Sequence, residues 1–232
     1  MIVPYIGLDR WIDMKSLDKH LKSTLAGHIG HDSWMPEEKR KYLKYLPEDV
    51  ETVLDIGCGL GELIWILKNK GYTVEGYDFD SFCIEKAKTI VSKAKYADVQ
   101  KLSKHYQINS FDLVTCTHVL EHLPSPYDAL NEIRKVTKKY ALLAVPNAKY
   151  IAFDEKETHL FSWNITTLRN LIENCGFKIV SFSYDWSNII PNILKLAPFL
   201  NRVLLRVFYD PLELIALIRK EEGSPGRQKI KT

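Results

Sequence analysis

Apolar residues along the chain follow two alternating patterns. Short apolar runs of the kind found in buried strands cover residues 51–57, 73–78, 95–99, 111–117, 139–147, 177–185 and 212–220. Segments with the apolar spacing of amphipathic helices cover residues 8–25, 36–46, 61–71, 81–95, 125–138 and 164–176. Because strands that alternate with helices form parallel sheets with helices on both faces, this pattern predicts an α/β fold with a doubly wound sheet.

Residues with capping preferences mark the ends of several of these helices. Ser81 is a suitable N-cap for the helix after the second strand, and Asn164 or Thr166 for the last helix. Gly71 and Gly176 follow two of the helices, at the position where a glycine accommodates the left-handed turn of the backbone. These residues support the helix boundaries given by the apolar pattern.

The chain is predicted to be one domain with additions rather than two domains. A helical extension covers residues 1–47, and the main domain covers residues 48–220. An apolar, helix-like insertion at residues 186–210 separates the last two strands, and residues 221–232 form a flexible basic tail. We expect the extension and the insertion to fold over the carboxyl ends of the strands, because segments added to a shared scaffold determine specificity.

The insertion carries a basic stripe. Lys195, Arg202 and Arg206 are spaced by seven and four residues and therefore share one face of a helix, with aliphatic residues around them. Three roles fit this pattern: a lid packed on the domain, a contact between two copies of the chain, or peripheral membrane contact through residues 189–208. The third role would imply a lipid or lipid-linked ligand.

Composition and charge limit the partners of the protein. Hydrophobic residues make up 46% of the chain and charged residues 26%, which is enough apolar content for a buried core. The net charge is +3, and the segment Arg219–Thr232 alone holds five basic and two acidic residues, so the rest of the chain is neutral overall. This distribution argues against a broad nucleic-acid surface.

Several features favour a soluble protein of the reducing cytoplasm. The first residues lack the basic start and long apolar core of a signal peptide, and no uncharged apolar run reaches the roughly 18 residues that span a membrane. The four cysteines show no paired metal-ligand spacing, and we expect free thiols at Cys58, Cys83, Cys116 and Cys175.

The stretch VLDIGCGLG joins the first strand of the main domain to the following helix and is the strongest chemical signal. Gly57, Gly59 and Gly61 alternate, which is one residue shorter than the G-x-G-x-x-G loop of dinucleotide-binding folds, and no lysine follows as in a phosphate-binding loop. Asp55 and Glu62 make both edges of the loop acidic. The loop therefore suits a ligand that carries positive charge rather than phosphates.

Five segments in the correct order resemble the motifs of the class I S-adenosylmethionine-dependent methyltransferases. Asp55 to Gly61 fits their first motif, Asp/Glu-x-Gly-x-Gly-x-Gly, at every fixed position. VEGYDFD, KYADVQKL, FDLVTCTHVLEHLPSP and LFSWNITTLRNLIENCGFKIV resemble the later motifs, and the similarity covers about residues 45–185. The resemblance implies a Rossmann-like, doubly wound, mostly parallel seven-stranded sheet with an antiparallel last strand. It also implies S-adenosyl-L-methionine as cofactor and S-adenosyl-L-homocysteine as product.

The resemblance also assigns cofactor contacts to residues of this chain. Asp55 would hold the amino group of the cofactor, Asp78 the two ribose hydroxyls and Asp98 the adenine amino group. The full set of expected cofactor-binding residues is Asp55, Gly57, Cys58, Gly59, Gly61, Asp78, Phe79, Asp98, Val99, Thr117 and His118. A carboxylate that faces two vicinal hydroxyls makes a strong charge-assisted pair. Asp80 is the alternative to Asp78, and it is otherwise expected to begin the next helix beside Ser81.

The acceptor side is less defined. A protonated oxygen or nitrogen acceptor needs a base within reach. His118 follows the fourth strand and His159 follows the fifth, so both are candidate catalytic residues. His118, Glu121 and His122 spell H-x-x-E-H, a metalloprotease pattern that requires one continuous helix. Because a β-rich strand precedes this segment and prolines follow it, we expect no metal site and a structural role for His122.

Three functions remain open from the sequence. The first is methyl transfer to an oxygen or nitrogen of a small-molecule acceptor, with a lipid-linked molecule or a sugar included. The second is an inactive, cofactor-binding partner subunit, and the third is an NAD-dependent oxidoreductase, which the glycine spacing disfavours. Methylation of a macromolecule stays open, although Thr115-Cys116-Thr117-His118 stands where many amide and adenine methylases carry N-P-P-Y or D-P-P-Y. The protein is expected to be a monomer or a homodimer.

Overall fold

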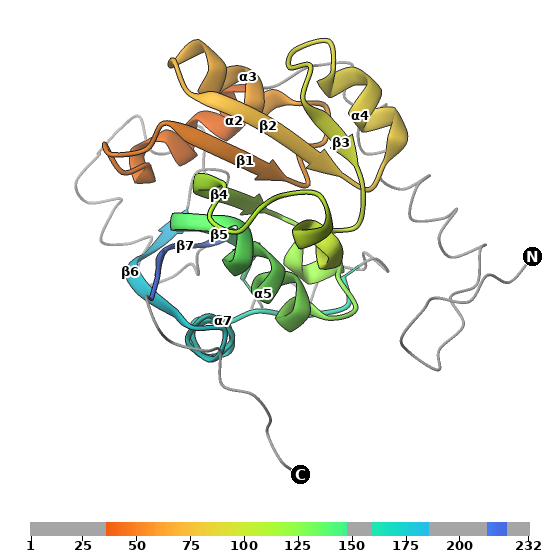
Figure 1. The fold of residues 1–232 in the computed structure, drawn as a ribbon. Coiled ribbons are helices and arrows are strands. Elements are labelled where there is room, and N and C mark those ends of the chain that lie inside the picture. Colours follow the sequence, from red (N-terminus) through yellow and green to blue (C-terminus); the bar gives the residue numbers. More distant parts are fainter. Residues whose placement is uncertain (1–35, 148–158, 186–212, 222–232) are drawn as a thin grey trace, which may run out of the picture.

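The computed structural model describes residues 36–147, 159–185 and 213–221 (Figure 1). The expected helix at residues 8–25, most of the extension 1–47, the insertion 186–210 with its basic stripe, and nearly all of the tail 221–232 lie outside the described residues. The domain boundaries therefore stay a prediction. Within the described residues, no helix is long and apolar enough to cross a membrane.

One seven-stranded sheet organises the described residues. The strand order is β3-β2-β1-β4-β5-β7-β6, and β7 runs antiparallel to both of its neighbours while the other neighbouring strands pair in parallel. The strands are β1 (Thr52–Ile56), β2 (Thr73–Asp78), β3 (Ala94–Tyr96), β4 (Phe111–Thr117), β5 (Thr137–Pro146), β6 (Phe177–Asp185) and β7 (Glu213–Lys220). The sheet confirms the predicted fold class.

Helices cover both faces of this sheet (Figure 1). The described helices are α2 (Pro36–Lys39), η1 (Arg40–Tyr45), α3 (Glu62–Asn69), α4 (Ser81–Ala87), η2 (Val99–Lys104), η3 (Leu120–His122), α5 (Pro126–Val136) and α7 (Ile165–Asn174). η1, α3 and α4 contribute apolar side chains to one core, and α5, α7 and η2 contribute to the core on the opposite face. The doubly wound arrangement therefore follows from amphipathic helices that each bury one apolar stripe against the sheet.

Local details differ from the sequence predictions in three places. Asp80, and not Ser81, is the N-cap of α4, because its carboxylate accepts a hydrogen bond of 2.8 Å from the backbone amide of Phe82. α4 ends at Ala87 instead of residue 95, shortly before a run of β-branched residues that lowers helix propensity. The helix expected at 36–46 is α-helical for one turn only and continues as the 3-10 helix η1. Asn164 caps α7, as one of the two predicted alternatives.

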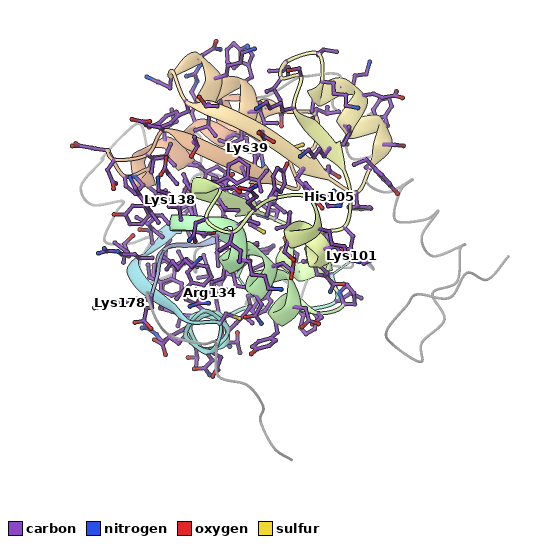
Figure 2. The ribbon with its side chains drawn as sticks, viewed as in Figure 1. Lys39, Lys101, His105, Arg134, Lys138 and Lys178 are labelled. Carbon is purple, nitrogen blue, oxygen red and sulfur yellow. The ribbon has the colours of Figure 1, made fainter. Side chains whose placement is uncertain are left out.

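Basic side chains of β5 and β7 gather at one place on the described surface, where Lys138, Lys139, Arg219 and Lys220 line a hollow together with Asp49. Asp112 lies 3.2 Å from Lys138 and 3.8 Å from Lys139, so acidic neighbours offset part of this charge. Figure 2 shows basic side chains on several different elements, among them Lys39, Lys101, Arg134, Lys138 and Lys178.

Candidate active site

The candidate site lies at the carboxyl ends of the central strands. The chain passes from β1 to β2 on one side and later returns to β4 on the other side, so the strand order reverses between β1 and β4. In open α/β sheets, ligands bind outside the carboxyl ends of the strands at such a switch point. Asp55 near the end of β1, Asp78 at the end of β2 and Thr117 at the end of β4 meet at this edge.

The glycine loop is fixed against β2 by backbone hydrogen bonds. The amides of Gly57 and Cys58 both donate to the carbonyl of Tyr77, at 2.7 and 3.2 Å. Gly57 has a φ of +67°, and a Cβ atom added there would overlap the side chain of Val119. Position 57 therefore requires glycine, because of both its backbone conformation and the close approach of the loop after β4.

Asp78 connects the glycine loop to the end of β2. Its carboxylate accepts hydrogen bonds from the backbone amides of Gly59, at 2.8 Å, and Asp80, at 2.9 Å. Burial raises the pKa of this carboxyl, and the bonds from the two amides oppose that effect. Asp78 is only 8% exposed, so it is a buried anion that also shapes the loop.

Asp55 is a second buried carboxylate of the site. Its Oδ1 atom accepts a hydrogen bond of 2.7 Å from the hydroxyl of Thr115, its partner in the register of β1 and β4. The side chain is 2% exposed, and burial raises its pKa to about 6, although Thr115 and the positive charge of Lys39 act in the opposite direction. Within the described part of the chain, no salt bridge neutralises this carboxylate.

The remaining expected cofactor residues follow the carboxyl ends of β1 to β4 and differ in their burial. Phe79 follows β2 and is 46% exposed, whereas Cys58, Val99 and Thr117 are all buried. Burial raises the pKa of the Cys58 thiol. Asp98 follows β3, where its carboxylate accepts from the amide of Gln100 at 2.9 Å and so caps η2. The structure thus brings these residues to one edge of the sheet, as expected from the sequence.

His118 follows β4 in a strained backbone conformation. Its φ is +56°, a left-handed value that costs a non-glycine residue about 1–3 kcal/mol. Its Nε2 atom lies 2.9 Å from Oε1 of Glu213, and its Nδ1 atom lies 3.4 Å from Oε1 of Glu121. Burial would lower the pKa of the imidazole, but the two carboxylates outweigh it and raise the pKa above the ordinary value. The side chain is still 40% exposed and therefore accessible.

Glu213 belongs to a network that the sequence prediction missed. It is 3% exposed at the start of β7, where its Oε2 lies 2.5 Å from Nζ of Lys41 and its Oε1 accepts from the hydroxyl of Tyr42 at 2.5 Å. Lys41 also pairs with Asp185 at the end of β6, at 2.8 Å. The one available signal was an acidic residue in front of the apolar stretch 214–218 of β7.

The second histidine candidate lies in a separate group. Ligand atoms of Glu121, His122 and His159 all lie within 4.8 Å of one another, and the rings of the two histidines meet edge to face. The carbonyl of Glu121 accepts from the amides of Leu160, at 2.7 Å, and Phe161, which holds the segment after His159 against η3. Two imidazoles and one carboxylate have the composition of a metal site, although the sequence pattern predicted none.

Comparisons with known proteins agree with this arrangement. A family model described as a methyltransferase domain matches residues 31–182. A ubiquinone biosynthesis O-methyltransferase of Coxiella burnetii is 30% identical over 143 residues, which are 52% of this chain and 56% of that protein, so the chain spans about half the length of this curated relative. An uncharacterized protein of Methanocaldococcus jannaschii is 26% identical over 83% of this chain and 92% of its own length.

Solved structures share the fold. The crystal structure of a SAM dependent methyltransferase from Archaeoglobus fulgidus superimposes with a TM-score of 0.64 at 22% identity, and the match covers 80% of this chain and 93% of that chain. At this level of identity the likeness concerns the fold. The order and direction of the strands therefore agree with the fold of this solved structure.

Proposed function

The chain belongs to the family of methyltransferase domains, and on this premise we propose that it moves a methyl group from S-adenosylmethionine to an oxygen or nitrogen of a small-molecule acceptor. S-adenosylmethionine is the cofactor of this class of enzymes, and the class assignment makes the chain a methyltransferase. The acceptor, its reacting atom and the roles of single residues are the parts that we propose.

One observation carries the proposal for the cofactor site. Asp55 is buried, its hydrogen-bond partner is the neutral hydroxyl of Thr115, and no cation of residues 36–147, 159–185 or 213–221 forms an ion pair with it. A buried charge needs a partner of opposite sign, and the ammonium group of a bound amino-acid moiety supplies one. The glycine loop beside it has no side chain at Gly57, Gly59 and Gly61. These features fit a cationic nucleoside that lies along the loop.

The proposed contacts follow the order of the strands. Asp55 would hold the amino group of the cofactor, Asp78 the ribose hydroxyls, and Asp98 the adenine amino group. Phe79 and Val99 would lie beside the adenine ring. When bound, S-adenosylmethionine supplies a methyl group that is activated by a positively charged sulfur. The residues of the chain mainly supply alignment, which is worth on the order of 7–11 kcal/mol for well-oriented reactants.

His118 is the proposed general base. It lies at the end of β4, close to the glycine loop through Val119, and its imidazole is accessible. The left-handed backbone conformation of His118 supports a functional role, because strained residues are concentrated at active sites and ligand-binding regions. The name of the Coxiella burnetii relative, an O-methyltransferase, favours oxygen as the acceptor atom. His159 would line the acceptor pocket instead.

The test is an acceptor screen with two histidine variants. Formation of S-adenosylhomocysteine from S-adenosylmethionine is measured by mass spectrometry with panels of phenols, catechols, alcohols and amines. We expect one class to stimulate turnover, His118→Ala to lower kcat by about 100-fold or more with little change in cofactor affinity, and His159→Ala to raise KM for the acceptor.

Two outcomes would contradict the proposal. Cofactor binding without turnover on any class of acceptor would favour an inactive partner subunit. Full activity of His118→Ala would remove His118 as the base.

A further inference from the structure

Glu121 is a fully buried acid whose carboxylate lacks the partners that such a group needs. It is 0% exposed in η3, the short helix after β4. Among the described residues, neither of its carboxylate oxygens has a hydrogen-bond partner, and no lysine or arginine forms an ion pair with it. A buried charge is costly unless a group of opposite sign compensates it. The surroundings of Glu121 therefore suit a bound cation.

Two histidines stand beside this carboxylate at distances close to those of a metal site. Oε1 of Glu121 lies 3.9 Å from Nε2 of His122, and one ligand atom each of Glu121, His122 and His159 lies within 4.8 Å of the other two. Around a tetrahedral ion with bonds of about 2.0–2.2 Å, ligand atoms are roughly 3.3–3.5 Å apart. The side chains thus have to approach one another by at most about 1.5 Å, which small rotations of the imidazole rings can supply.

The backbone holds the third ligand next to the other two. The carbonyl of Glu121 accepts hydrogen bonds from the amides of Leu160, at 2.7 Å, and Phe161, at 3.1 Å. These bonds fix the segment that carries His159 against η3. The H-x-x-E-H pattern predicted no metal because it requires one continuous helix. The ligand set in the structure is a different one, since its third member comes from a separate segment of the chain.

The donor atoms indicate the kind of ion. Imidazole nitrogens suit zinc and other divalent transition metals, whereas magnesium and calcium prefer oxygen ligands throughout. Three protein ligands leave at least one coordination position open, as in catalytic zinc sites, and structural zinc sites have four. His122 is 26% exposed and His159 is half-buried, so the open position can be reached from outside the protein.

We propose that Glu121, His122 and His159 form a site for a divalent transition-metal ion, and that the open position of this ion takes an oxygen of the methyl acceptor. The site is on the acceptor side, because Oε1 of Glu121 lies 3.4 Å from Nδ1 of His118 and none of the three ligands is an expected cofactor residue. A bound cation orients an oxygen ligand and favours its deprotonated form. Metal binding is independent of the proposed function, and only the acceptor contact rests on it.

The test titrates the full chain, stripped of metal, with Zn²⁺ by calorimetry and counts the bound ions by mass spectrometry. We expect one tightly bound ion per chain. His159→Ala and Glu121→Gln should each raise the Kd for Zn²⁺ by at least about tenfold, because even residues behind the ligands of a metal contribute that much. His105→Ala is the matched control: it removes an exposed histidine that contacts Tyr77 and should leave binding unchanged.

Thermal unfolding protects the test against a variant that fails to fold. Glu121→Gln removes a buried charge without partners, so the metal-free variant should unfold at the same Tm as the metal-free wild type or higher. An ion that binds the folded chain stabilises it by mass action. Zn²⁺ should therefore raise the Tm of the wild type and of His105→Ala, and leave the Tm of Glu121→Gln and His159→Ala unchanged.

The outcomes separate this proposal from the proposed function. No stoichiometric binding of Zn²⁺ to the wild type, or equal binding in all four proteins, would overturn the metal site. One ion per chain that is lost in His159→Ala, together with transfer that does not respond to the ion, would keep the metal site and overturn its contact with the acceptor. The same loss of metal in a chain that methylates no acceptor would overturn the proposed function alone.

Discussion

Replacement of Asp78 is the sharpest test of the cofactor site. The carboxylate already accepts two backbone hydrogen bonds, of 2.8 and 2.9 Å, and the proposed ribose contact would add two hydroxyl donors on its remaining lone pairs. Hydrogen bonds to a charged group contribute about 1.5–3 kcal/mol each. We therefore expect Asp78→Ala to weaken binding of S-adenosylmethionine by at least about 1.5 kcal/mol, which is roughly tenfold or more in Kd.

The same substitution should also lower stability. Asp78 is 8% exposed, and its loss in the alanine variant leaves the amides of Gly59 and Asp80 without their acceptor. That loss costs about 1–3 kcal/mol of unfolding free energy for a buried group. Asp78→Asn is the better variant, because it keeps the volume and one acceptor oxygen while removing the charge.

Calorimetric titration with S-adenosylmethionine and S-adenosylhomocysteine, beside urea unfolding, separates the two effects. Asp80→Asn is the matched control. It neutralises a neighbouring carboxylate whose hydrogen bond from the amide of Phe82 caps α4, so it should lower stability by about 1 kcal/mol at most and spare affinity. Unchanged affinity in Asp78→Asn would refute the reasoning. A larger loss of affinity in Asp80→Asn would move the ribose contact to that residue.

Three further expectations follow from the site. Gly57→Ala should lower both cofactor affinity and stability, because the added Cβ overlaps the side chain of Val119. Gly71→Ala is the control: Gly71 also has a positive φ, but no atom lies near its added Cβ, so this variant should lower stability alone. Equal cofactor affinities in the two variants would contradict this. Burial gives Asp55 a pKa of about 6 in the folded protein, against 3.8 in the unfolded chain, so its contribution to the stability of the apoprotein falls as the pH rises from about 4 to 6. The affinity for S-adenosylmethionine should rise over the same range, because the carboxylate becomes charged. A Kd that does not depend on pH between 5 and 7.5, or the same pH dependence in Asp55→Asn, would contradict this. Chelation with EDTA should lower methyl transfer, and an added divalent ion should restore it, because the ion returns to the group of Glu121, His122 and His159. Methyl transfer that is unchanged after removal of all metal would contradict this.

Most of the fold could be predicted because its strands have a local signature. All seven begin and end within three residues of the apolar runs. The clearest are β1, β4 and most of β5, because a strand buried on both faces is apolar along its length, whereas β3 and β6 are partly exposed. Helix ends were less predictable. Ser81 and Asp80 are both good N-caps by residue type, and only the backbone geometry at the end of β2 shows that the Asp80 carboxylate reaches the amide of Phe82.

The placement of the glycine loop at the switch point of the sheet could be predicted and the network around His118 could not, for the same physical reason. Asp55 and the glycines are consecutive in sequence, so one segment contains most of that site. Glu213 is 95 residues from His118 and 171 from Tyr42, and three separate elements must pack before these groups meet. No local pattern records such a contact. His122 and His159 are similar, since their edge-to-face contact depends on the path of the chain after β5.

Calorimetric titration of the wild-type chain with S-adenosylmethionine, and in parallel with NAD, tests the central claim most directly. The acidic, alternating glycine loop and the buried Asp55 predict that one molecule of S-adenosylmethionine binds per chain, that binding is weaker below pH 6, and that NAD produces no heat of binding. Binding of NAD at the same concentrations, or binding of S-adenosylmethionine that survives both Asp55→Asn and Asp78→Asn unchanged, would contradict the account.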